Sequence, residues 1–109
     1  MSNLLQFSIS EVLSLLEKKE FSTKELVETY INAIEKTKDL NMYLTTCFDQ
    51  ALEQAKVSDK NYLNGNQRLL EGIPLAVKDM FCTKGIETTA SSKILKKFIP
   101  TYESTVTQN

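Results

Sequence analysis

The chain has 109 residues and a net charge of −1, with 13 lysines and arginines against 14 aspartates and glutamates. This length allows one modest domain, and the balanced charge argues against a protein that binds nucleic acid mainly through phosphate contacts, which usually needs a basic stripe. The absence of histidine excludes Ser-His-Asp and Cys-His catalysis and histidine-ligated metal sites within these residues.

Two amphipathic helices are predicted near the N-terminus. Ser8 with Glu11, and Ser22 with Glu25, have the spacing of a capping box, in which each side chain satisfies a backbone N–H group of the first turn. Apolar residues then recur at helical spacing and give each helix a core-facing stripe. The stripes consist of Ile9, Val12, Leu13 and Leu16 in the first helix and of Leu26, Val27, Tyr30, Ile31 and Ile34 in the second. Residues 1–40 are therefore expected to be helical.

A β-α-β unit is predicted after these helices. Residues 42–48 are rich in aromatic and β-branched side chains, which favours a strand. Asp49 is a suitable N-cap for a third helix, which Asn64-Gly65-Asn66 should end, because these residues accept the left-handed backbone common at helix ends. The apolar run Ile73–Val77 predicts a second strand, with Pro74 at its start or edge. The predicted fold class is therefore α/β.

Loops and short helices are predicted for the remaining residues. A loop follows Lys78, and either Ser91 or Ser92 is a candidate N-cap for a short helix that Pro100 ends. Ser104 is a candidate N-cap for a further helix.

The two cysteines and the N-terminus indicate the compartment. Cys47 and Cys82 match no metal or redox spacing, so free thiols are favoured over a disulfide. No apolar run is long enough to cross a bilayer, and the first residues have neither the basic start nor the apolar core of a signal peptide. The sequence predicts a cytoplasmic protein that binds no membrane.

Lys78 is the candidate catalytic residue. It follows five apolar residues and shares a predicted strand face with the short side chains of Pro74 and Ala76, so its stem would lie over a pocket. Burial favours the neutral amine of a lysine, which can act as a base. The residues alone nevertheless favour a simpler interpretation, namely a solvated charge at a strand end or an ion pair with Asp79.

The segment Gly72–Asp79, with the sequence GIPLAVKD, resembles the G-[IV]-P-[IVL]-x-[VI]-K-D element of the amidase signature family. The likeness continues through residues 81–85, 88–90, 92–95 and 102–106, and the predicted helices and first strand match the family's usual opening. The resemblance implies that Lys78 is the base of a Ser-cisSer-Lys triad, in which a bridging serine relays the proton of the nucleophilic serine.

The resemblance also has implications for fold and domain organisation. It implies that residues 1–109 are the incomplete N-terminal part of a single amidase domain built around a mixed sheet. In that domain, residues 1–40 would be helical, and residues 41–109 would carry early strands, the lysine motif and the following helices.

Within the family, the likeness is greatest to the glutaminase subunits of tRNA-dependent amidotransferases, especially over residues 78–85. It implies that glutamine is the substrate and that the released ammonia amidates glutamate or aspartate on misacylated tRNA. It further implies two companion subunits in a heterotrimer. One of them would use ATP and Mg²⁺ and bind most of the tRNA, so that this chain would hold no cofactor and no metal.

The resemblance places both triad serines beyond residue 109, so this chain alone is expected to be inactive. Ser91 and Ser92 are poor substitutes, because they lie where the family has a structural element. Met80 and Ser91 depart from the family's usual Asn and Gly, which affects the local loop rather than the base. Two alternatives stay open: a fragment of another amidase that hydrolyses small amides, and a noncatalytic module that binds a partner through its amphipathic helices.

Overall fold

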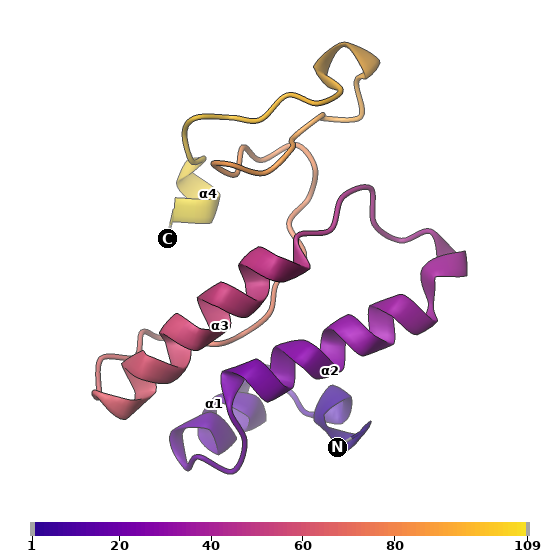
Figure 1. The fold of residues 1–109 in the computed structure, drawn as a ribbon. Helices are drawn as coiled ribbons and strands as arrows, with labels where there is room; N and C mark the ends of the chain where they lie inside the picture. The colour runs from indigo at the N-terminus through magenta and orange to yellow at the C-terminus, as the bar shows by residue number, and fades with distance from the viewer. Residues whose placement is uncertain (1, 109) are drawn as a thin grey trace. The chain divides into compact units, whose positions relative to one another are not determined.

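The computed structural model describes residues 2–108, and all regular secondary structure within them is helical (Figure 1). The elements are η1 (Ser2–Gln6), α1 (Ile9–Glu17), α2 (Thr23–Lys36), η2 (Lys38–Leu40), α3 (Phe48–Leu63), η3 (Lys93–Leu95) and α4 (Thr105–Gln108). The chain divides into two compact units between Pro74 and Leu75. No helix in the described range has the length and apolar composition needed to cross a membrane.

The two N-terminal helices begin at the predicted residues. The Ser8 hydroxyl accepts a hydrogen bond from Glu11 N–H at 3.2 Å, and Ser8 N–H donates to Oε2 of Glu11 at 3.0 Å, which confirms the first capping box. At α2, the Ser22 hydroxyl accepts from Glu25 N–H at 3.1 Å. The described structure contains only this serine half of the second box, so Ser22 is confirmed as the N-cap but the reciprocal pair is not.

A residue of α3 also caps the N-terminus of α2. The carboxylate of Asp59 accepts hydrogen bonds from the N–H groups of Thr23 at 2.7 Å and Lys24 at 3.3 Å. A negative charge at this end of a helix also interacts favourably with the helix dipole. The bonds tie the start of α2 to the C-terminal half of α3, and the two helices pack side by side and antiparallel (Figure 1).

The core of the first unit lies around η1, α1 and α2. Its buried apolar side chains are Leu4, Val12, Leu16, Phe21 and Leu26, against which Leu15, Tyr30, Tyr62 and Ile73 pack partly buried. The predicted stripes therefore do face the core, although their first member, Ile9, is 55% exposed. η1 lies within the residues expected to be helical, although no capping pattern marked it as a separate element, and it contributes Leu4.

α3 begins slightly earlier than its predicted cap. Its N-cap is Cys47, which forms no side-chain capping bond within the described chain, and Asp49 lies in the first turn. Asp49 as the N-cap is therefore wrong, although its carboxylate is well placed for the helix dipole. The predicted end is confirmed, because Asn64 is the C-cap and Gly65 adopts a left-handed φ of 71°.

The predicted strands at residues 42–48 and 73–77 are not formed within the described residues. Both segments are irregular apart from Phe48, which begins α3, and Leu75 and Val77 are 74% and 48% exposed. A strand is stabilised by hydrogen bonds to a neighbouring strand and by side-chain pairs across it. Alternation within one segment supplies neither. The β-α-β unit is therefore not confirmed, and the regular secondary structure of the described residues consists of helices joined by irregular segments.

The second unit is built on two antiparallel arms, residues 82–88 and 98–104. They are joined by backbone hydrogen bonds from Gly85 to Pro100 at 3.0 Å, from Thr88 to Phe98 at 3.0 Å and from Ser104 to Cys82 at 2.8 Å. Side-chain carboxylates add two bonds across the arms, from Lys97 N–H to Glu87 at 2.6 Å and from Lys84 N–H to Glu103 at 3.2 Å. The pairing is too sparse to make regular strands.

Two predicted caps are confirmed in the second unit. The Ser92 hydroxyl accepts a hydrogen bond from Ile94 N–H at 3.3 Å and begins η3. The Ser104 hydroxyl accepts from Thr107 N–H at 3.3 Å at the start of α4. Both serines therefore satisfy backbone N–H groups that a helix start leaves unpaired.

Candidate active site

The lysine motif begins at Gly72, where the backbone passes directly over the core of the first unit. Its φ of 83° lies in the left-handed region, which glycine adopts without steric cost. A Cβ at this position would lie 2.8 Å from Oγ1 of Thr23 and 3.1 Å from Cδ1 of Leu16. Both of these residues are buried, at 1% and 2% exposure. Gly72 therefore seats the start of the motif on α1 and α2.

The residue before the motif, Glu71, is a buried carboxylate held by α3. Ser58 donates a hydrogen bond to its Oε2 at 2.6 Å, Asn61 donates to its Oε1 at 2.8 Å, and the Tyr62 hydroxyl donates to its carbonyl at 2.8 Å. Burial alone would raise the pKa of Glu71. The two side-chain bonds, and then the N–H and charge of Arg68, outweigh burial and hold the pKa below its ordinary value of 4.5.

Acid is expected to destabilise the first unit through Glu71. A carboxyl group with a lower pKa in the folded chain than in the unfolded chain contributes stability that is fully present above about pH 4.5 and is lost as the pH falls through the folded pKa. Urea unfolding of the chain from about pH 6 to about pH 3 should show this loss, and Glu71→Gln should flatten it.

An exposed glutamate of α3 offers the control for this measurement. Glu53 pairs with Lys56 at 3.0 Å and its side chain is 73% exposed, so Glu53→Gln should leave the pH dependence close to that of the unmodified chain. Equal flattening by the two variants would contradict the role given to Glu71.

Lys78 lies in an exposed, irregular segment of the second unit. Its carbonyl accepts hydrogen bonds from Met80 N–H at 2.8 Å and Phe81 N–H at 3.2 Å, so the chain turns tightly directly after the lysine. Within residues 2–108 its ammonium group forms no ion pair or hydrogen bond. Of the two simpler interpretations, an ion pair with Asp79 is therefore wrong, whereas a solvated charge agrees with the exposure of Lys78 in the described structure. The catalytic role of Lys78 stays a prediction.

The carboxylate of Asp79 is bound by the loop at Thr89. Its Oδ1 accepts Thr89 N–H at 2.7 Å, and its Oδ2 accepts a hydrogen bond from the Thr89 hydroxyl. The hydrogen bond from the Thr89 hydroxyl lowers the pKa of Asp79 most, and the bond from the Thr89 N–H group comes second. Together with the weaker effects of the Ala90 and Ser91 N–H groups, they outweigh burial and hold the pKa below its ordinary value of 3.8. The lysine motif therefore ends on an ionised, fully engaged carboxylate.

The adjacent serines have structural roles in the described chain. The Ser92 hydroxyl caps η3. Ser91 has a left-handed φ of 61°, which favours the glycine that the family resemblance leads one to expect there. No hydrogen bond within residues 2–108 joins either serine to the Lys78 ammonium.

Both cysteines are free thiols, as predicted. Cys47 is exposed, and the Cys82 thiol donates a hydrogen bond to the Tyr102 hydroxyl at 3.5 Å. In the described part of the chain no three His, Cys, Asp or Glu side chains are grouped to hold a metal ion.

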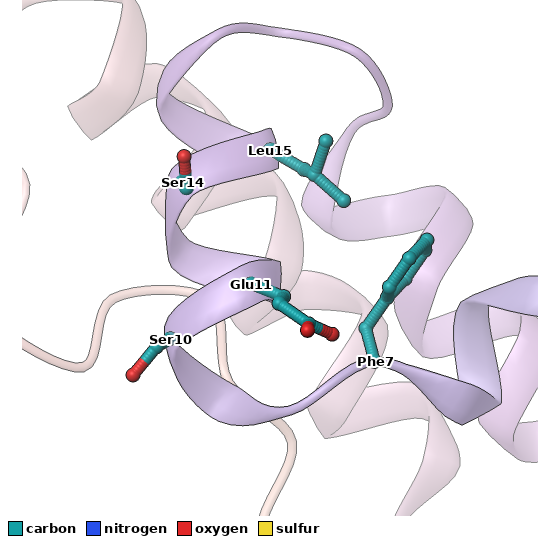
Figure 2. A pocket seen from close by; sticks show the side chains of 5 residues that line it. All are labelled: Phe7, Ser10, Glu11, Ser14 and Leu15. Carbon is teal, nitrogen blue, oxygen red and sulfur yellow. The ribbon is translucent and has the colours of Figure 1, made fainter.

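A hollow of about 390 Å³ lies on α1 in the first unit. It is lined by Phe7, Ser10, Glu11, Ser14 and Leu15. Figure 2 shows the Phe7 ring and the Leu15 side chain on one side of the helix and the two serine hydroxyls on the other. Its one titratable side chain, Glu11, is engaged in the capping box with Ser8. The hollow is therefore not the candidate active site.

The sequence pointed to Lys78 but not to the residues that hold its segment. Part of the Glu71 site could have been predicted, because its two side-chain donors, Ser58 and Asn61, are three residues apart and lie on one face of a predicted helix. The partner of Asp79 had no such signal, since a contact from Asp79 to Thr89 depends on how the loop between them folds.

Comparisons with known proteins confirm the family resemblance that the lysine motif indicated. A family model described as Amidase matches residues 25–109. The glutamyl-tRNA(Gln) amidotransferase A subunit of Rickettsia bellii (strain OSU 85-389) is 55% identical over 109 residues, which are 100% of this chain and 22% of that protein. Proteins of the same name are 47% identical over 110 residues in Chelativorans sp. (strain BNC1) and 44% identical over 109 residues in Hyphomonas neptunium (strain ATCC 15444), with the same two coverages. The chain thus spans 22% of the length of these curated relatives. It belongs to the Amidase family.

Proposed function

We propose that this chain is the N-terminal part of the glutaminase subunit of a tRNA-dependent amidotransferase, and that Lys78 is its catalytic base. The observation that carries the proposal is the similarity along all 109 residues to proteins named as A subunits of glutamyl-tRNA(Gln) amidotransferases, at up to 55% identity. The structure is compatible with this role, because the neighbouring carboxylate of Asp79 is engaged by Thr89 and does not pair with the Lys78 amine.

The proposed chemistry is a proton relay. A neutral Lys78 amine takes a proton from a bridging serine, which in turn deprotonates the serine that attacks the glutamine amide. Such a base must lose its hydration, because desolvation favours the neutral form of a lysine. In this chain Lys78 is exposed. The proposal therefore includes burial of Lys78 by the part of the amidase domain that this chain does not contain, which would also supply the two serines.

The remaining roles in the proposal belong to companion subunits. One of them would activate glutamate or aspartate on misacylated tRNA with ATP and Mg²⁺ and would receive the ammonia, so this chain needs no cofactor of its own. The protein would act in the cytoplasm. Its near balance of 13 basic and 14 acidic residues is consistent with tRNA binding mainly by a partner.

Activity is expected only where Lys78 and both serines are present together. The 109-residue chain incubated with glutamine or with simple aliphatic amides should release no ammonia above a Lys78→Ala control, because a base without a nucleophile has nothing to activate. The full-length protein assembled with its companion subunits should release ammonia from glutamine and support amidation of Glu-tRNA.

The same assays separate the alternatives. A full-length protein that hydrolyses small amides rapidly, without companion subunits and without preference for glutamine, would indicate a different amidase. Ammonia release by the 109-residue chain that depends on Lys78 would show that the nucleophile lies within these residues and would overturn the proposed division of the site.

A further inference from the structure

Asp79 binds a turn of the second unit rather than the lysine beside it. Its carboxylate accepts hydrogen bonds from the N–H and the hydroxyl of Thr89. Ala90 and Ser91 have positive φ values of 48° and 61°. Thr89 leads directly into this turn, and its two donors bind a side chain of the lysine motif.

The backbone of Lys78 is consequently held from its C-terminal side. Its carbonyl accepts N–H groups of Met80 and Phe81 at 2.8 and 3.2 Å, and the Asp79 side chain ties the adjoining residue to Thr89. The lysine side chain itself is exposed and unpaired within the described residues. The contacts therefore restrain the backbone at Lys78, while its ammonium group stays available.

We propose that Asp79 is a positioning residue for Lys78, acting through its two hydrogen bonds to Thr89. The inference rests on the proposed function, since it assumes that Lys78 is the base. A base must lie within hydrogen-bonding reach of the proton it accepts, and a long side chain on a loosely held backbone samples many other positions. The bonds to Thr89 restrict that backbone without neutralising the amine.

The test uses the full-length protein assembled with its companion subunits. Asp79→Ala should lower kcat for glutamine hydrolysis about a hundredfold, the loss expected from misplacing a catalytic group by about 1 Å, with KM for glutamine nearly unchanged. Thr89→Val, which keeps the N–H donor but removes the hydroxyl, should give a smaller loss. Thr89→Ser keeps both donors and should retain kcat close to the unmodified enzyme. Amidation from added ammonia should persist in every variant.

Glu87 provides a matched control in the same unit. Its carboxylate also accepts a backbone N–H, from Lys97 at 2.6 Å, but it joins the two arms and not the lysine segment. Glu87→Ala should therefore leave kcat unchanged. An Asp79→Ala enzyme that keeps kcat within about threefold, well short of the hundredfold expected, would overturn the inference, and so would an equal loss in Glu87→Ala or a parallel loss of ammonia-dependent amidation.

Failure of the proposed function has a different signature. If Lys78→Ala leaves glutamine hydrolysis intact, Lys78 is not the base and the function proposed above is wrong. If Lys78→Ala abolishes hydrolysis while Asp79→Ala does not, only the positioning role of Asp79 is wrong.

Discussion

Replacement of Lys78 with arginine is expected to abolish glutamine hydrolysis by the full-length, assembled enzyme as completely as replacement with alanine. Guanidinium stays protonated and cannot accept a proton, so arginine preserves the charge but not the base. Loss of a base alone removes about a hundredfold to ten-thousandfold in rate, and interruption of a relay can remove more. Ammonia release from glutamine, measured under saturating substrate, reports this step directly.

Amidation from added ammonia is the internal control for Lys78. In the proposed complex that chemistry belongs to a companion subunit, so both variants should retain it and thereby show that the complex is intact. Lys78 forms no ion pair within the described residues that an arginine could preserve, so the interpretation that this experiment tests against the base is a solvated charge. An Arg variant with glutaminase activity within a few fold of the unmodified enzyme would refute the assignment.

Gly72→Ala is expected to give a large loss of stability in the first unit. The new methyl group would lie 2.8 Å from Oγ1 of Thr23 and 3.1 Å from a methyl carbon of Leu16, and both neighbours are buried. Overpacking of this kind costs about 1–3 kcal/mol, and a non-glycine residue in the left-handed region costs about 1–2 kcal/mol more. Urea unfolding of the chain should therefore show a free energy of unfolding lower by about 2–5 kcal/mol.

Gly65→Ala isolates the steric part of this loss. Gly65 has a similar φ of 71°, but a Cβ there would have no atom within 4 Å, so only the backbone cost of about 1–2 kcal/mol applies. Thr23→Ala combined with Gly72→Ala should recover part of the difference, because it removes Oγ1, which is buried without a hydrogen-bond partner among the described residues. Equal destabilisation by the two glycine variants would show that Gly72 does not contact α2 as described.

Gly72 and Asp79 attach the two ends of the lysine motif to other parts of the chain. Gly72 and the preceding Glu71 attach the first end to the helical unit, and Asp79 attaches the other end to the Thr89 turn. The residues between them, 75–78, are exposed in this chain.

The sequence by itself determined the local features of this protein. Helix starts at Ser8 and Ser22 were predictable, and the start at Ser92 was one of two candidates, because a capping serine interacts with N–H groups two or three residues away. The apolar stripes of α1 and α2 were predictable for the same reason, since helical periodicity is a property of one short segment. The lysine motif was also readable, because its residues are consecutive.

The tertiary structure alone decided the features that join distant residues. Asp59 caps α2 from 36 positions away, and no local pattern marks it as a partner of Thr23. The strands predicted from alternation were not formed in the described residues, because a strand depends on neighbours that its own sequence does not specify. Thr89 likewise became the partner of Asp79 only through the path of the intervening loop. Local hydrogen bonds and periodicity are encoded within a few residues, whereas such pairings depend on the packing of the folded chain.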